Sequence, residues 1–285
     1  MKTWFITGAS RGFGALITEK ALAKGDSVVA TARNPRTITD RFGDNPNVLA
    51  MGLDVTDEAQ AHAAAKAAVE RFGRIDILVN NAGYGLLGAV EEATAEEIEA
   101  VYRTNVFGLL AVTRAVLPHM RRQRSGRIFN LSSVGGYIGI QGWGVYCSTK
   151  FAIEGLSEAL ALELKPLGIE VTAVEPGFFR TDFLDASSLA VSPHRIDDYH
   201  QTSGAMRDFA AGVNHAQPGD PDKLAEILVE LADRSNLPVR LPLGSDTVAA
   251  IEKKNAETAA LVDSWREVSV STDFVPGTAA AALAG

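Results

Sequence analysis

The stretch that decides the fold is residues 3–14, which read TWFITGASRGFG. Its first residues, Thr3 to Thr7, form a nearly all-apolar run, which is typical of a central parallel strand covered on both faces. A glycine-rich turn follows, and apolar residues at helical spacing begin at Ala15. Glycines let a backbone approach a pyrophosphate, and a helix N-terminus offers free N–H groups and the positive end of its dipole. The sequence therefore predicts a dinucleotide-binding α/β fold.

Further apolar runs alternate with helical patterns along the chain. Such alternation predicts a doubly wound parallel sheet with right-handed crossovers, in a single domain with an additional C-terminal helix. The predicted strands are 27–32, 47–53, 75–79, 126–131 and 169–174, and the clearest helices are 58–72, 223–232 and 247–265. A further long helix opens in the polar segment 91–99.

Composition limits the classes of partner. The 285 residues are 46% hydrophobic and 22% charged, with a formal net charge of −8, so a nucleic-acid surface is not expected. The cluster of basic residues is expected to close a helix C-terminus, where cations are favoured; it comprises Arg121, Arg122, Arg124 and Arg127.

The single cysteine, Cys147, allows no intrachain disulfide, which is consistent with a reducing cytoplasm. We find no signal peptide before the first strand and no apolar run long enough for a membrane anchor, so we expect a soluble cytoplasmic protein. The five histidines lack metal-ligand spacing, so no metal is expected.

Tyr146 and Lys150 stand at the start of a helical pattern that continues from Phe151. They are four residues apart and therefore share one helix face. A phenol has a pKa of about 10, and a neighbouring ammonium lowers it toward the range where tyrosine works as an acid–base group. Ser133 follows the strand 126–131, at the sheet edge where open α/β folds bind ligands. By itself the Tyr–Lys pair is also compatible with a solvated helix face.

Together, the turn Thr-Gly-x-x-x-Gly-x-Gly at residues 7–14, the Asn-Asn-Ala-Gly at 80–83 and the Tyr-x-x-x-Lys at 146–150 resemble the short-chain dehydrogenase/reductase family. The resemblance implies that Tyr146 exchanges the proton, that Ser133 holds the reacting oxygen and that Lys150 assists the tyrosine. It also makes Asn105 the fourth catalytic residue, holding a water that links Lys150 to solvent. A local cap or kink is the alternative explanation for an asparagine within a helical pattern.

The same resemblance implies a nicotinamide cofactor held at the glycine turn and at the carboxyl ends of the strands. The expected cofactor-binding residues are Thr7, Gly8, Ser10, Arg11, Gly12, Phe13, Gly14, Arg33, Asp54, Val55, Asn81, Ala82, Gly83, Tyr146, Lys150, Pro176, Gly177 and Thr181.

Two arginines favour NADP(H) over NAD(H). The second strand ends at Ala32 and is followed by Arg33, where NAD-binding proteins usually carry the acidic residue that holds the ribose hydroxyls. A guanidinium is well suited to bind a 2′-phosphate, and Arg11 in the glycine turn is a second candidate. In the family, basic residues at these two positions go with NADP(H).

Regularity fades between Phe178 and Pro218, and a stretch this long without structure is usually a lid or binding loop. Its scattered apolar residues favour a lipophilic substrate, although they are equally compatible with core under a loop. The candidate pocket residues are Trp143, Phe178, Phe179 and Phe183, with Tyr137 as a further wall. We thus divide the chain into a core at 1–181, a lid at 182–218, an extension at 219–270 and a flexible tail at 271–285.

The C-terminal extension, with Gly-Ser-Asp at 244–246 before its last helix, resembles the branch of the 17β-hydroxysteroid and retinol dehydrogenases. This departure from the shorter family pattern puts tetramer formation through the last strand in doubt. The family implies a homodimer through the helices around Asn105 and Tyr146.

The sequence thus predicts an NADP(H)-dependent enzyme that interconverts a carbonyl and an alcohol on a lipophilic small molecule. Two alternatives stay open. One is a non-catalytic NADP(H) sensor with the same fold. The other is the same chemistry on a small polar aldehyde or sugar, with which Asp185, Ser187, Ser188 and Asp197 in the lid are compatible.

Overall fold

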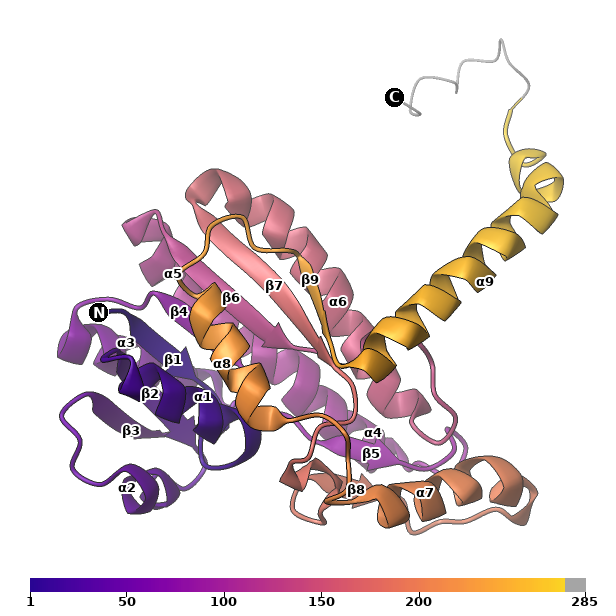
Figure 1. The fold of residues 1–285 in the computed structure, drawn as a ribbon, viewed down its shortest axis with the longest axis horizontal. Helices are drawn as coiled ribbons and strands as arrows, with labels where there is room; N and C mark the ends of the chain where they lie inside the picture. Colours follow the sequence, from indigo (N-terminus) through magenta and orange to yellow (C-terminus); the bar gives the residue numbers. More distant parts are fainter. Residues whose placement is uncertain (275–285) are drawn as a thin grey trace.

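The computed structural model describes residues 1–274, and within them seven parallel strands form one sheet in the order β3-β2-β1-β4-β6-β7-β9 (Figure 1). The chain passes outward through β1, β2 and β3 and then crosses to β4, so the order reverses between β1 and β4. Ligands bind at such a switch point, outside the carboxyl ends of the strands. The strands are β1 (Thr3–Ile6), β2 (Ser27–Ala32), β3 (Val48–Gly52), β4 (Ile77–Asn80), β6 (Gly126–Leu131), β7 (Ile169–Pro176) and β9 (Arg240–Leu243).

Helices cover both faces of the sheet, because successive strand residues point to opposite sides. Trp4 and Ile6 of β1 pack with α1 and α8, whereas Phe5 packs with α3 and α5. The helices are α1 (Gly12–Ala23), α2 (Arg36–Phe42), α3 (Glu58–Phe72), α4 (Ala95–Tyr102), α5 (Leu109–Gln123), α6 (Gly144–Leu164), α7 (Ala205–Val213), α8 (Pro221–Leu231) and α9 (Ser245–Val270). The fold class predicted from the sequence is confirmed.

The predicted long helix after residue 91 is two helices joined by a π-helical segment, Arg103–Gly108. α4 begins at Ala95 because Thr94 and Glu97 form a capping box. α5 ends at Gln123; the next residue, Arg124, is its C-cap and has a left-handed backbone, and Arg121 and Arg122 occupy the last turn. Most of the arginine cluster therefore closes a helix C-terminus as expected.

The expectation that 178–218 lacks structure is wrong. This segment contains α7 and the strand β8 (Leu189–Val191), which pairs in parallel with β5 (Gly85–Leu87). The helix is only nine residues long, so its few apolar residues read as scattered rather than as one helix face. The strand is three residues long, which is too short for a recognisable alternation.

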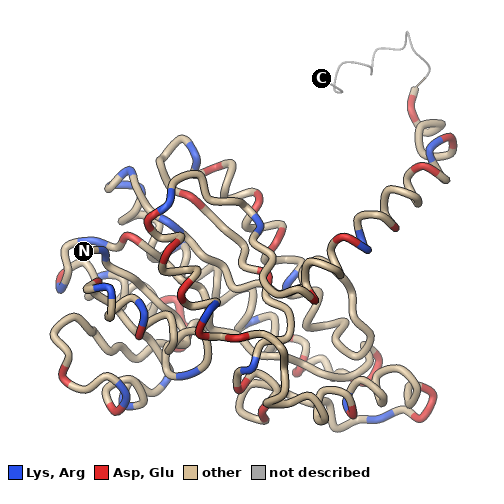
Figure 2. The backbone as a smooth tube through the Cα atoms, in the orientation of Figure 1, with Lys and Arg blue, Asp and Glu red and all other residues tan. Residues whose placement is uncertain are grey.

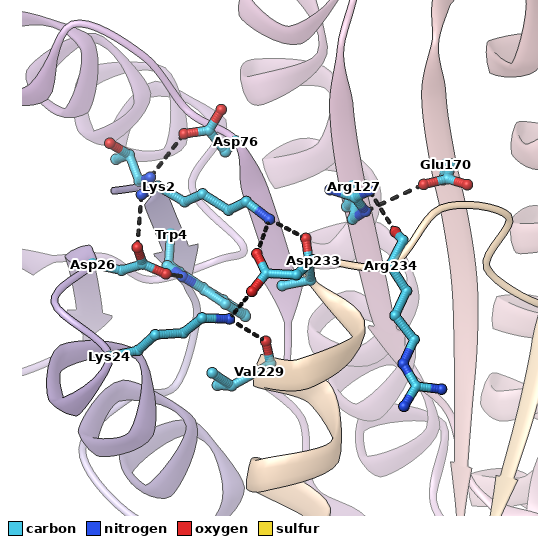
Figure 3. Close-up of polar contacts among 12 residues, drawn as sticks. Lys2, Trp4, Lys24, Asp26, Asp76, Arg127, Glu170, Val229, Asp233 and Arg234 are labelled. Atoms are coloured by element: carbon cyan, nitrogen blue, oxygen red, sulfur yellow. Dashed lines mark hydrogen bonds and ion pairs between the residues drawn. The ribbon is translucent and has the colours of Figure 1, made fainter.

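Polar contacts tie the amino ends of the strands together (Figure 3). Asp26 accepts hydrogen bonds from Lys2 N and Trp4 Nε1 at 2.7 and 3.0 Å, and Asp76 accepts one from Thr3 N at 2.8 Å. Lys2 Nζ also pairs with Asp233 at the end of α8, 2.5 Å away. These contacts fix the start of β1 and leave the opposite sheet edge for ligands.

α9 projects from the body of the molecule (Figure 1), and its outer half carries exposed apolar side chains such as Leu261 and Trp265. Lysines and arginines are interspersed with acidic residues over the described chain (Figure 2). No helix within residues 1–274 combines the length and apolarity needed to cross a bilayer. The tail predicted at 271–285 falls mostly on residues 275–285, which lie outside the described part of the chain.

Candidate active site

A cavity of about 860 Å³ opens at the carboxyl ends of β1, β4, β6 and β7. Its size is near the upper end for ligand pockets, which span about 300–1,000 Å³. Nearly all residues predicted for the site line it: Gly8, Ser10, Arg11, Gly12, Phe13, Arg33, Asp54, Val55, Asn81, Ala82, Gly83, Ser133, Trp143, Tyr146, Lys150, Pro176, Gly177, Phe178, Phe179, Thr181 and Phe183. Thr7, Gly14 and Asn105 do not line the cavity but lie behind it.

The glycine turn fits the backbone approach that a pyrophosphate requires. Gly8 and Gly12 have φ angles of +64° and +53°, a region that favours glycine. A Cβ on Gly14 would lie 2.4 Å from the Gly8 carbonyl oxygen, so only glycine permits this close packing. No side chain caps the N-terminus of α1, and its first N–H groups are left for an anion.

Thr7 and Asn81 lock this turn to the one after β4. The Thr7 hydroxyl accepts hydrogen bonds from Asn81 N and Ala82 N, both at 2.9 Å. In return, Asn81 Nδ2 donates to the carbonyls of Thr7 and Gly8 at 2.9 and 3.1 Å. Thr7 therefore shapes the predicted cofactor site from behind.

Arg11 and Arg33 lie at the end of the cavity formed by β1, β2 and their following turns, with Asp54 beside Arg33. Hydrogen bonds from Thr56 lower the pKa of Asp54, and the charge of Arg33 adds to this effect. Arg11 Nη2 donates to the Ser187 carbonyl at 2.5 Å and thus joins the glycine turn to the segment after β7.

Tyr146 lies in the first turn of α6 and is buried beside Ser133. Burial raises the pKa of Tyr146 above its ordinary value, and the hydrogen bond with Ser133 offsets only part of this effect. Ser133 follows β6 and caps a short 3₁₀ turn, its Oγ accepting from Gly135 N at 3.1 Å.

We expected Lys150 to lower the pKa of Tyr146 toward neutrality, but the surroundings of the two residues in the structure do not have this effect. Lys150 Nζ donates to the Leu131 carbonyl at 2.7 Å and lies 5.6 Å from the centre of the Tyr146 ring. Burial lowers the pKa of Lys150 itself to about 8, while the carboxyl of Glu154 opposes that change. Desolvation is the largest cause of both pKa shifts, because both groups are buried.

Asn105 is buried in the π-helical segment, where the wider turn accommodates a residue that disfavours helix interiors. Its Nδ2 donates to Tyr84 O at 2.9 Å and Thr149 Oγ1 at 3.2 Å, and its Oδ1 accepts from Tyr84 N at 3.1 Å. A Cβ on Gly83 would lie 3.1 Å from Asn105 Oδ1. Asn105 therefore fixes the turn after β4 and the start of α6, and the helix irregularity expected as an alternative is present.

Asp246 is a site residue to which the sequence analysis assigned no role. Its Oδ2 accepts from Phe178 N at 2.8 Å, and a Cβ on Gly177 would lie 2.2 Å from the same oxygen. Gly177 N in turn donates to Leu243 O at 3.1 Å. Asp246 of the Gly-Ser-Asp motif thus holds the Pro176–Gly177 turn. In the sequence, Asp246 stood out only as an acidic residue of this motif, in the first turn of a helix.

An aromatic wall stands next to Tyr146. The rings of Trp143 and Phe183 lie 6.4 Å apart and nearly parallel, and each lies 5.6 Å from the Tyr146 ring. A Cβ on Gly85 would lie 2.9 Å from Trp143 and 3.2 Å from Phe183, so β5 backs this wall closely.

Of the other aromatic residues predicted to form the pocket, Phe178 and Phe179 line the cavity and Tyr137 does not. Phe178 packs edge-on against Phe209, and Phe179 against Phe13, while both also line the cavity. Tyr137 does not line the cavity; its hydroxyl donates to Asn255 Oδ1 of α9 at 2.5 Å, which corrects the expectation that it forms a pocket wall.

Glu92 holds the segment 196–207, which follows β8, and sequence reasoning missed it. Its buried carboxylate accepts hydrogen bonds from Ile196 N at 3.0 Å and Ser203 Oγ at 3.2 Å, and it pairs with Arg207 of α7. Burial alone would raise the pKa of Glu92, but these backbone hydrogen bonds, with one from Ala89 N, and the Arg207 ion pair lower it to about 2. A carboxylate in a polar loop gave no sign of this partnership.

We compared the sequence with protein-family models and with known proteins. A family model described as short chain dehydrogenase matches residues 2–191. Oxidoreductase BOA17 of Botryotinia fuckeliana is 41% identical over 274 residues, covering 95% of this chain and 99% of that protein. A 3-ketodihydrosphingosine reductase of Bacteroides thetaiotaomicron is 38% identical over 240 residues, covering 84% and 86%.

Solved structures agree with these matches. A short-chain dehydrogenase from Streptomyces avermitilis superposes with a TM-score of 0.87 at 39% identity, covering 96% of this chain and all of that one (100%). ElxO with NADP bound gives a TM-score of 0.72 at 28% identity, covering 87% and 99%. A short-chain dehydrogenase/reductase from Burkholderia phymatum, in complex with NAD, gives 0.79 at 26%, covering 91% and 95%.

Proposed function

This chain belongs to the short-chain dehydrogenase family, and we propose that it interconverts a carbonyl and an alcohol on a lipophilic small molecule with NADP(H) as its cofactor. Family membership makes it an oxidoreductase of this type. The observation that carries the finer proposal is the convergence of Ser133, Tyr146 and Lys150 beside an aromatic wall in one cavity.

The residues of the cavity fit a nicotinamide dinucleotide. The crowded glycines and the uncapped end of α1 suit its pyrophosphate, and the Pro176–Gly177 turn and Thr181 suit its nicotinamide end. When bound, NADP(H) supplies the hydride for reduction or accepts it in oxidation. Structural relatives with NADP and with NAD support a nicotinamide cofactor, and we infer NADP(H) from Arg11 and Arg33.

In the direction of reduction, Tyr146 donates its phenolic proton to the carbonyl oxygen, and Ser133 donates a hydrogen bond to the same oxygen as charge develops on it. A raised pKa keeps the Tyr146 proton in place near neutral pH, which suits a proton donor. The Lys150 ammonium binds the cofactor ribose and stabilises the phenolate that is left. Asn105 supports the proton relay by fixing the start of α6 through Thr149.

We assign residues 182–218 as the lid and the wall formed by Trp143 and Phe183 as the part of the pocket that selects a lipophilic substrate. A relative whose name describes reduction of a keto group on a sphingoid lipid supports a lipophilic ketone. The match to the hydroxysteroid and retinol dehydrogenase branch remains a prediction.

The test is oxidation of NADPH, with NADH in parallel, against bulky hydrophobic ketones and against small polar aldehydes. The proposal expects turnover of the bulky set with NADPH preferred. Preference for NADH would refute the assignment of the arginines, and turnover of only the small aldehydes would refute the lipophilic pocket. Tight NADPH binding without any turnover would favour the sensor.

A further inference from the structure

Two buried carboxyl groups, Glu154 and Glu175, lie directly behind the proposed catalytic residues. Glu154 stands one turn after Lys150 on α6, and Glu175 is the last residue but one of β7, just before the turn at Gly177. Their relative exposures are 2% and 1%. Neither residue lines the cavity, and the mechanism above assigns a role to neither.

These carboxyl groups have too few partners to be both ionised. The nearest charge is Arg240 of β9, whose Nη1 lies 3.6 Å from Glu154 Oε2 and 3.4 Å from Glu175 Oε1. When both groups are treated as carboxylates, both oxygens of Glu154 and one of Glu175 lack a well-formed hydrogen bond, and the Ser132 hydroxyl is the neutral side-chain donor that lies near Glu154. Because both carboxyl groups lie against the same Arg240 nitrogen, one proton on Glu175 can be shared with Glu154.

The pKa values of the two carboxyl groups also favour one shared proton. Burial, and next the charge of Glu154, raise the pKa of Glu175 to about 7. Burial also raises the pKa of Glu154, while Ser132, Arg240, Glu175 and Lys150 all favour its ionised form. Near neutral pH the pair therefore carries one proton and one negative charge, as expected for two like groups in one site.

The charged and titratable groups around the pair come from every neighbouring element. Lys150 and the exposed Glu158 lie on α6, and Arg240 on β9 also binds Glu158 at 2.9 Å. The ring of Tyr137 lies 5.1 Å from the Arg240 guanidinium. Glu154 stands four residues after Lys150 on α6, both residues are buried, and Glu154 is the carboxyl group that opposes the loss of charge at Lys150.

We propose that Glu154 is a positioning residue of the reaction: its buried carboxylate, sharing one proton with Glu175, is the counter-charge that holds Lys150 in its ammonium form. This inference rests on the proposed function, in which Lys150 must be charged. It also connects the C-terminal strand to the reaction, because Arg240 holds both carboxyl groups.

The first test compares Glu154→Gln with Glu158→Gln, a matched change one turn further along α6 on the exposed partner of Arg240. For NADPH-dependent turnover from pH 6 to 10, we expect the alkaline half-activity point of E154Q to lie about one pH unit below that of the wild type, since removing a nearby opposite charge lowers the pKa of an ammonium by about that much. The E158Q profile should overlay the wild type. Equal profiles for E154Q and E158Q, or a loss of E154Q activity that is uniform across the pH range, would overturn the proposal.

A second test needs neither substrate nor cofactor and does not depend on E154Q folding. Because the folded-state pKa of Glu175 is raised to about 7 from the ordinary 4.5, its proton stabilises the wild type fully below pH 4.5, and this stability is lost as the pH rises through 7. Glu175→Gln mimics the protonated group, so its urea-unfolding free energy should lack that decline. Equal slopes in both proteins would refute the shared proton. A clear difference in slope without turnover of any carbonyl would refute the proposed function alone.

Discussion

We propose that Arg33 and Arg11 set the preference of the site for NADP(H) over NAD(H). Both line the cavity, and Arg33 follows β2 where a carboxylate would repel a 2′-phosphate. We expect Arg33→Ala to raise the KM for NADPH roughly tenfold or more, since a hydrogen bond to a charged group contributes about 1.5–3 kcal/mol, and to leave the KM for NADH nearly unchanged. Arg36→Ala, an exposed arginine of α2, is the control. A parallel rise for both cofactors would contradict the assignment.

We expect Lys150 to set the alkaline limit of the proposed reaction. Its pKa is lowered to about 8 by burial, so it is charged below pH 8 and neutral well above it. NADPH-dependent reduction, measured as kcat at saturating NADPH, should therefore fall as the pH rises through about 8. A rate that stays constant to pH 10 would show that the charge of Lys150 is not needed.

The residue types at the site were readable from the sequence, but their electrostatics were not. Spacing placed Tyr146 and Lys150 on one helix face, as the structure has them. It did not reveal that burial governs both pKa values, because desolvation depends on all the residues packed around a group. Glu175 and Arg240 are 65 positions apart and meet only because β7 and β9 pair.

Elements with strong local signals were predictable. β2, α3 and β6 have the predicted bounds, because apolar runs or an N-cap with a glycine end define them. The strand β8 and the helix α7 were not predicted, because both depend on residues far away in the sequence. β8 pairs with β5, and Arg207 of α7 pairs with Glu92. The π-helical turn at Asn105 likewise depends on contacts with Tyr84 and Thr149.

Glu92 connects residues 196–207, which belong to the proposed lid, to the body of the molecule. Replacing it by glutamine leaves the buried Arg207 without its counter-charge, and breaking such a pair costs about 3–5 kcal/mol. We expect Glu92→Gln to lower the free energy of unfolding at pH 7 by this order and to raise the KM for the carbonyl substrate more than it changes kcat. Glu96→Gln, on the exposed side of α4, serves as the control.

The pH dependence gives a second check on Glu92. Because its folded-state pKa is lowered to about 2, its contribution is present above pH 4.5 and is lost as the pH falls toward 2. The stabilities of wild type and E92Q should therefore converge in acid. A difference that persists unchanged to pH 2 would contradict the ion-pair account.

For the whole molecule, we propose a homodimer through the helices around Asn105 and Tyr146. Phe151 and Leu162 of α6 are 47% and 77% exposed and, being eleven residues apart, lie on one face; Phe107 in the π-helical segment is 60% exposed. Analytical ultracentrifugation should give twice the chain mass of 30.2 kDa. Leu162→Glu should yield monomers, whereas Leu261→Glu on α9 should not. If only Leu261→Glu yielded monomers, the proposed interface would be wrong and α9 would form the dimer contact.

The central claim is that Tyr146 transfers the proton during carbonyl reduction. The most direct measurement compares wild type and Tyr146→Phe in NADPH oxidation with the best carbonyl substrate, together with NADPH binding followed by fluorescence. The account predicts that NADPH still binds and that turnover falls about 10²–10⁴-fold, the usual contribution of a general acid. Near-normal turnover by the phenylalanine variant would contradict it.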